Sequence, residues 1–188
     1  LLLRFGIAWH PETKLHWAYP SIKKVHHGFG YYITLKKKIA LLLEKGGYKA
    51  TFRGNATYRS DMTQHIETTL FQQAWYEFKQ HPIDTYDLLV PHSSSDWIPA
   101  QHRHPMGYQC ILVFDSVLSN TPSFHQVQLK DTIQKNVPCY HVHQFWSTQE
   151  TDHIKQHFGQ SPVVLGVPKS IETVQLSIDL WRCQQWLY

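Results

Sequence analysis

Residues 25–52 read VHHGFGYYITLKKKIALLLEKGGYKATF, and this stretch decides the predicted fold. Apolar residues recur at helical spacing after the glycine pair Gly28 and Gly30, which predicts a helix over residues 31–45. Gly46 and the glycine after it are expected to end that helix. Residues 48–53 then predict a strand, so the stretch is typical of a helix that leads into a β-sheet.

The same alternation continues on both sides of this stretch. Further strands are predicted over residues 4–9, 86–92, 108–114, 138–143 and 162–166, and further helices over 68–79, 124–135, 149–158 and 170–188. Alternating strands and helices indicate parallel βαβ units. We therefore predict an α/β fold: a Rossmann-like three-layer domain with a mostly parallel sheet of about six strands. It spans residues 1–188 as a single domain, which could be one lobe of a larger two-lobed protein.

Charge and composition narrow the classes of protein. The chain has 18 lysines and arginines against 14 acidic residues, a surplus of only +4, and 42% of its residues are hydrophobic. Disorder is excluded, and the surplus is too small for a nucleic-acid surface, so no nucleic-acid partner is predicted. Cys110, Cys139 and Cys183 lie in apolar runs and predict buried free thiols, which favours a cytoplasmic protein. No apolar run reaches the length of a membrane span.

Ligands of such sheets bind where loops leave the carboxyl ends of strands. The loop with Gly28, Phe29 and Gly30 either opens a helix whose N-terminus binds an anion or is a plain turn, which a GxG pair more often forms. The later strand ends contribute Asp115 and His143 as acid/base candidates. They also contribute candidate substrate-binding residues: His92, Ser93, Ser116, Trp146 and Ser147.

Several short motifs resemble the N-terminal lobe of GT-B-fold glycosyltransferases. They are the glycine pair, "LLLEKGGYKATF" at 41–52, "DLLVPHS" at 87–93 and "LGVPK" at 165–169. The resemblance implies a lobe that binds a sugar or lipid-linked acceptor, with the nucleotide-sugar donor bound by a second lobe or subunit. It calls for no metal or cofactor. Asp115 stands where that family commonly has a histidine.

Two alternatives remain open. "IAWHPET" at 7–13 resembles the first motif of zinc-dependent N-acetylglucosaminyl deacetylases, which implies zinc on His10 and on His102 or His104, with Glu12 as base, although Thr13 replaces a ligating aspartate. The third hypothesis is a non-catalytic Rossmann-like subunit that recruits a catalytic partner through aromatic residues of its last helix, Trp181 and Trp186. Lysines 36–38, with Lys23 and Lys24, add a possible peripheral contact with an anionic membrane.

Overall fold

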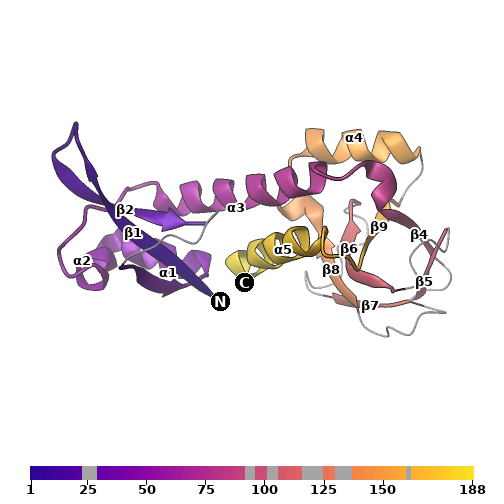
Figure 1. Cartoon of the computed structure of the whole chain (residues 1–188), viewed down its shortest axis with the longest axis horizontal. Coiled ribbons are helices and arrows are strands. Elements are labelled where there is room, and N and C mark those ends of the chain that lie inside the picture. Colours follow the sequence, from indigo (N-terminus) through magenta and orange to yellow (C-terminus); the bar gives the residue numbers. More distant parts are fainter. Residues whose placement is uncertain (23–28, 92–95, 101–105, 116–124, 130–136, 160–161) are drawn as a thin grey trace. The chain divides into compact units, whose positions relative to one another are not determined.

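A computed structural model describes residues 1–22, 29–91, 96–100, 106–115, 125–129, 137–159 and 162–188. Contacts between residues divide the chain into two units. Unit 1 comprises Leu1–Gln73 and Gln185–Tyr188, and unit 2 comprises Ala74–Gln184. Figure 1 shows the strands and helices of each unit.

Unit 1 contains a three-stranded antiparallel sheet in the order β2-β1-β3. Its strands are β1 (Leu2–His10), β2 (Leu15–Ser21) and β3 (Tyr31–Thr34). β1 and β2 form a hairpin in which Trp9 pairs with His16 and His10 with Leu15, and Figure 1 shows the two strands running together to its tip. The predicted strand over 4–9 is confirmed, but β2 lies where no strand was predicted.

The helices of unit 1 begin after β3. They are α1 (Lys37–Leu42), a π-helical turn η1 (Leu43–Gly47), α2 (Tyr48–Thr51) and the first part of α3 (Met62–Lys79), which continues into unit 2. The predicted helix over 31–45 is wrong in its first turn, because residues 31–34 pair with β1 as β3. The break in the helix is confirmed at Gly46, whose φ of 113° lies in the left-handed region that favours glycine.

The predicted strand over residues 48–53 is also wrong, because aromatic packing holds this segment as a helical turn. Phe52 is fully buried, with its ring centroid 5.6 Å from that of Phe5 and 5.1 Å from that of Tyr31. Tyr48 stacks on Tyr58 at 5.6 Å. The Phe52 N–H donates to the Tyr48 carbonyl at 2.8 Å, as in a helix.

Unit 2 contains a closed six-stranded barrel in the order β4-β5-β7-β8-β6-β9. The strands are β4 (Asp87–Pro91), β5 (Asp96–Pro99), β6 (Tyr108–Val113), β7 (His125–Leu129), β8 (Val137–His141) and β9 (Val164–Pro168). A 3-10 turn, η2 (Ile83–Thr85), precedes β4. Within the described residues, the pairs β5–β7 and β6–β8 are parallel and the other four pairs are antiparallel.

The Rossmann-like, mostly parallel sheet of about six strands is therefore wrong. Two strands that the sequence did not predict, β5 and β7, enter the sheet, and β7 occupies residues of the predicted helix over 124–135. β9 runs antiparallel to both of its neighbours, whereas a doubly wound sheet would need it parallel. The strands β4, β6, β8 and β9 do lie near predicted positions.

In the core of the barrel, the large side chain of Tyr108 packs against Gly166. Tyr108 is buried, and a Cβ added to Gly166 would lie 2.5 Å from the Tyr108 ring. The Tyr108 hydroxyl donates to Oδ2 of buried Asp87 at 2.7 Å, which satisfies two polar groups inside the barrel. Burial, followed by the Asp87 carboxylate, raises the pKa of Tyr108. Leu89, Ile111, Val113, Val137, Cys139 and Val164 complete this core.

The helical elements after β8 are η4 (Val142–Gln144), α4 (Thr148–Phe158) and α5 (Val174–Leu187). α5 begins in unit 2, and its last residues are counted with unit 1. The prediction of three buried free thiols is confirmed for Cys110, Cys139 and Cys183. Burial raises the pKa of Cys110 and of Cys139 to about 12, so these thiols are unreactive while the chain is folded.

Candidate functional site

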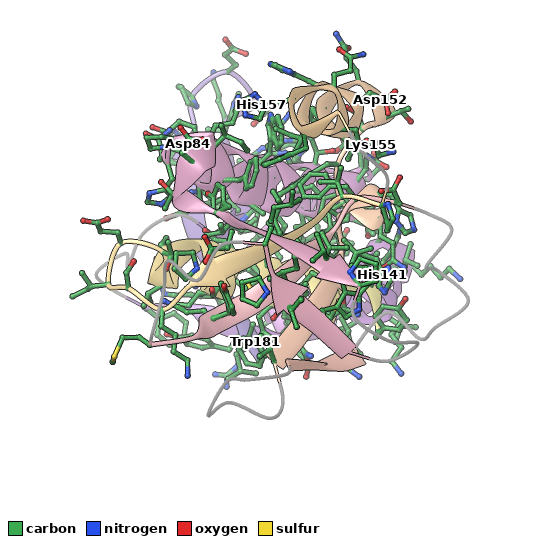
Figure 2. All side chains as sticks on the ribbon, turned by 90° about the vertical axis from the view of Figure 1, so that its right-hand side faces the viewer. Asp84, His141, Asp152, Lys155, His157 and Trp181 are labelled. Atoms are coloured by element: carbon green, nitrogen blue, oxygen red, sulfur yellow. The ribbon has the colours of Figure 1, made fainter. Side chains whose placement is uncertain are left out.

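The two acid/base candidates lie beyond neighbouring strand ends in unit 2. β6 and β8 are parallel, so Asp115 and His143, which follow them, lie at the same edge of the sheet. Lys155 of α4 joins them: its Nζ lies 3.8 Å from Asp115 Oδ1, and its charge acts on His143. Figure 2 labels Lys155 on α4. The sequence did not predict Lys155, because it lies on a helix face and in no motif.

Asp115 already has structural partners. Its Oδ2 accepts a hydrogen bond of 2.6 Å from the Val163 N–H, just before β9. Its Oδ1 faces Lys155, and its side chain is only 13% exposed. A carboxylate held in this way is an anchor between β6 and β9, which lowers its availability as a general base.

His143 differs from Asp115, because one of its ring nitrogens has no hydrogen-bond partner in the described part of the chain. Burial, followed by the Lys155 charge, lowers the pKa of His143, so its imidazole is neutral near pH 7. Its Nδ1 is buried and has no hydrogen-bond partner among the described residues. The ring lies 5.9 Å from that of His141, which is itself buried.

Trp146 and Ser147 have structural roles at the start of α4. Trp146 is buried, with its ring centroid 4.9 Å from Trp75 and 5.1 Å from Phe78. Ser147 is the N-cap of α4: its Oγ accepts from the Glu150 N–H, and the Glu150 carboxylate accepts from the Ser147 N–H at 2.8 Å. This capping box occupies the polar atoms predicted to bind a substrate.

The glycine loop does not open a helix. Gly28 lies outside the described residues, and Gly30 is followed by strand β3. A Cβ on Gly30 would lie 2.5 Å from the Arg4 side chain, whose guanidinium donates to the Phe29 carbonyl at 3.1 Å. Gly30 therefore makes room for Arg4, and the helix N-terminus expected to bind an anion is absent at this position. The Phe29 side chain is 79% exposed.

The remaining candidates are only partly described. His92, Ser93, Ser116, His102 and His104 lie outside the described residues. His10 and Glu12 lie at the tip of the β1–β2 hairpin, where His10 Nδ1 accepts from the Thr13 N–H at 3.4 Å. No group of three or more potential metal ligands occurs among the residues that the structure describes.

The two aromatic residues of the last helix differ in exposure. Trp181 is 40% exposed, whereas Trp186 is fully buried. Within unit 1, Trp186 Nε1 donates to Glu67 at 2.9 Å, and the same carboxylate pairs with Lys37 at 2.6 Å. Trp186 therefore packs inside unit 1, so only Trp181 could take part in the dock of the third hypothesis.

A groove at the hairpin of unit 1 is a site that the sequence did not predict. It has a volume of about 230 Å³ and lies between the hairpin tip and the loop before Tyr58. Its lining residues are Trp9, Lys14, Leu15, His16, Gly54, Asn55, Ala56 and Thr57. The two sides are held together by backbone hydrogen bonds: Thr57 N–H donates to the His16 carbonyl at 2.7 Å, and Ala18 N–H to the Thr57 carbonyl at 2.9 Å.

Two cations beside this groove have an unusual backbone. Lys14 and Arg53 both have a φ of 52°, and they are the two non-glycine residues with positive φ in the described part of the chain. Lys14 lines the groove, and Arg53 directly precedes its residue Gly54. Both side chains are exposed and form no ion pair with a described residue. Strained backbone of this kind occurs preferentially at functional sites.

The charge of the chain is unevenly divided. Unit 1 has 11 lysines and arginines against 4 acidic residues, a net charge of +7. Unit 2 has 7 against 10, a net charge of −3. The net charge of +4 for the whole chain therefore conceals a strongly basic unit 1, and the charge argument against a nucleic-acid partner does not apply to that unit.

The fold and this site define an α/β protein with a basic unit that has an indole and a lysine at a hairpin groove and an arginine beside that groove. Comparison with models of protein families, with curated proteins and with solved structures gives no match. None of the described helices combines the length and apolar character that a membrane-spanning helix needs.

Proposed function

We propose that unit 1 binds single-stranded nucleic acid in the hairpin groove. The observation that carries this proposal is that two cationic residues, Lys14 and Arg53, have a left-handed backbone conformation beside a groove lined by the indole of Trp9. An exposed glycine or asparagine would adopt the same backbone with less strain. Two cations held there at an energetic cost indicate an anionic ligand.

The residues in and beside the groove match the parts of a nucleotide. Trp9 is 55% exposed, and a base that stacks on an indole contributes about 1–3 kcal/mol of binding free energy. Lys14 and Arg53 pair with the phosphates on either side, and the Asn55 amide both donates and accepts hydrogen bonds at a base edge. The strand must be single, because a base within a duplex has no free face for Trp9.

The other cations of unit 1 extend the positive field around the groove. Lys38, Lys45 and Lys49 form no ion pair with a described residue, in contrast to Lys37 and Arg59. A net charge of +7 attracts a polyanion over a distance of about 10 Å at 0.1 M salt. The free, buried thiols fit a cytoplasmic location, which we include in the proposal.

The glycosyltransferase interpretation stays a prediction and has lost its structural basis. It depended on a Rossmann-like sheet and on a helix after Gly30, and the chain has a mixed barrel and strand β3 at these places. The hairpin groove needs neither of these features. We therefore favour nucleic-acid binding over acceptor-sugar binding by the glycine loop.

Fluorescence anisotropy of a labelled 20-nucleotide single-stranded DNA tests the proposal. We expect micromolar or tighter binding at 0.1 M salt, weaker binding to the matching duplex, and an affinity that falls linearly with the logarithm of salt concentration. Binding of the oligonucleotide should quench the fluorescence of Trp9, and a Trp9→Ala variant should lose that quenching. Equal affinity for duplex, or association only with phosphatidylserine vesicles, would contradict the proposal.

A further inference from the structure

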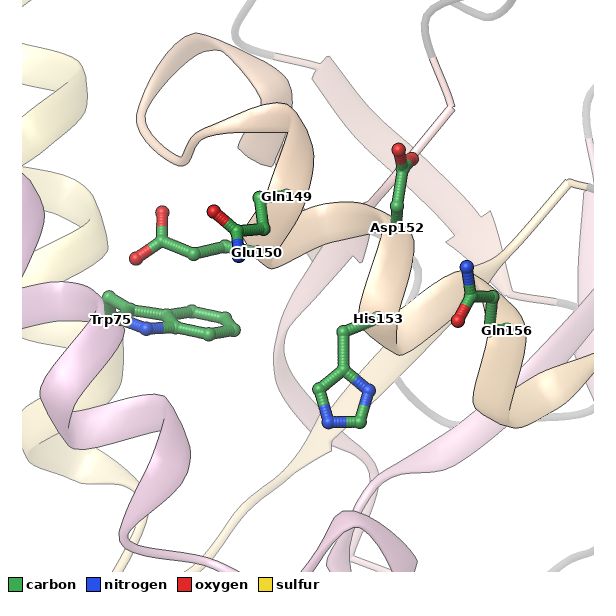
Figure 3. Close-up of a pocket in the computed structure, with 6 residues that line it drawn as sticks. All are labelled: Trp75, Gln149, Glu150, Asp152, His153 and Gln156. Carbon is green, nitrogen blue, oxygen red and sulfur yellow. The ribbon is translucent and has the colours of Figure 1, made fainter.

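A second groove lies in unit 2, between the end of α3 and the outer face of α4. It has a volume of about 540 Å³ and is lined by Trp75, Gln149, Glu150, Asp152, His153 and Gln156. Figure 3 shows Trp75 on one helix, with Gln149 and Glu150 near it and His153 and Gln156 further along α4. We propose that this groove binds a neutral carbohydrate. The proposal is independent of the hairpin groove, which shares no residue with it.

Two residues of the groove, Trp75 and Glu150, are held in place before a ligand arrives. Trp75 stacks on Phe78 at 5.5 Å and meets the edge of buried Trp146 at 4.9 Å. Glu150 is held by the capping box with Ser147, in which its carboxylate accepts at 2.8 and 2.9 Å. Groups that are already ordered lose little entropy when a ligand binds.

Charge balance points to a neutral ligand. Two carboxylates, Glu150 and Asp152, line the groove, and one ammonium group lies next to Asp152 and another over the ring of Trp75. Lys155 Nζ is 3.6 Å from Asp152 Oδ1, and Lys79 Nζ is 5.3 Å from the centre of the Trp75 ring. A cationic ligand would be repelled by Lys79, and an anionic ligand would be repelled by Glu150 and Asp152.

The groups that remain available match a polyhydroxylated ring. Gln149, His153 and Gln156 are exposed, and each amide offers two donors and an acceptor oxygen. The indole of Trp75 gives an apolar wall for the C–H face of a sugar, and the amides and carboxylates surround it with hydrogen-bonding partners. One aromatic wall with several neutral hydrogen-bonding groups suits a polar, uncharged ligand, and a sugar ring has both an apolar C–H face and hydroxyl groups to match it.

Saturation-transfer NMR of the full chain with maltohexaose, cellohexaose and chitohexaose tests the proposal. We expect at least one saccharide to bind, and the double variant Gln149→Ala/Gln156→Ala to weaken that binding tenfold or more. Both glutamines are exposed, so the variant should fold normally. His157→Ala, an exposed change on the same helix outside the lining, is the matched control and should leave the affinity unchanged.

Three results would overturn the proposal. The first is that none of the three saccharides binds, and the second is that saccharide binding persists in the double variant. The third is that spermine, used as a cationic probe, binds the groove more tightly than any saccharide and loses its affinity in the double variant. Oligonucleotide binding should be the same in this variant as in the natural chain.

Discussion

Replacing both Lys14 and Arg53 with glycine should raise the free energy of unfolding and weaken oligonucleotide binding at the same time. A non-glycine residue in the left-handed region is strained by about 1–2 kcal/mol. Glycine avoids this strain, but its more flexible unfolded chain lowers the free energy of unfolding by about 0.5–1 kcal/mol. The net gain in the free energy of unfolding is about 0.5–1 kcal/mol for Lys14→Gly and again for Arg53→Gly. For a chain of this length the double variant should melt roughly 2–8 °C higher.

The effect on binding has the opposite sign. Each phosphate contact to a single strand contributes about 0.7 to the salt slope, which corresponds to roughly fivefold in affinity at 0.1 M salt. The double variant should therefore bind the 20-nucleotide strand roughly 25-fold more weakly, and its salt slope should be smaller by about 1.4. Differential scanning calorimetry and anisotropy titrations at three salt concentrations measure the two effects.

Two control variants separate charge from backbone strain. Lys14→Ala removes the charge and keeps the left-handed backbone strained, so it should lose about fivefold in affinity without becoming more stable. Lys38→Ala removes one exposed charge of unit 1 that does not line the groove, and should change the affinity much less. If the double glycine variant were less stable, or if Lys38→Ala lost as much affinity as Lys14→Ala, the reasoning would be refuted.

Three further predictions follow from single groups. Glu12→Gln removes the acidic residue of the loop that contains Lys14, and it should tighten oligonucleotide binding about two- to fivefold at 0.05 M salt. This effect should vanish at 1 M salt. Weaker binding in the same titration would argue against the groove as the binding site. Gly166→Ala places a Cβ 2.5 Å from the buried Tyr108 ring and should lower the free energy of unfolding by about 1–3 kcal/mol in urea titrations, so an unchanged midpoint would contradict this packing. The lowered pKa of His143 means that the unfolded chain binds a proton near pH 6.5 before the folded chain does, so stability falls as pH drops below about 6.5. His143→Gln should lessen that loss between pH 7.5 and 5.5, and an identical loss in both proteins would exclude His143 as its cause.

The strands that the sequence predicted are those with continuous apolar runs. Cys110, Ile111, Leu112 and Val113 are all buried in β6, and such burial on both faces is visible in the sequence itself. β2 and β7 include histidine, glutamine or proline and are strands because their neighbours pair with them. Pairing partners are a tertiary property, and so is strand direction: β4, β6 and β9 were all predicted as strands, but their antiparallel pairing is not visible in the sequence.

The candidate sites were predictable to a similar extent. The rule that ligands bind at strand ends predicted a common edge for Asp115 and His143, and the parallel pair β6–β8 has that geometry. Lys155 could not be predicted, because its approach to Asp115 depends on how α4 packs. The hairpin groove was missed for two reasons: β2 was not predicted as a strand, and a lysine or arginine with left-handed backbone has no signature in the sequence.

A change at Trp9 should test the stacking contribution separately from the charges. Trp9 is 55% exposed, so Trp9→Ala should alter the free energy of unfolding little. Loss of one stacked base should weaken oligonucleotide binding by about 1–3 kcal/mol, or roughly 5- to 150-fold, while the salt slope stays the same because no charge changes. Trp9→Phe retains an aromatic face and should recover most of that affinity. Since Lys14→Ala changes the slope and Trp9→Ala does not, the two variants together separate phosphate pairing from base stacking. A salt slope that fell in Trp9→Ala would mean that the indole only positions the loop of Lys14, and the groove would then bind phosphate without a base.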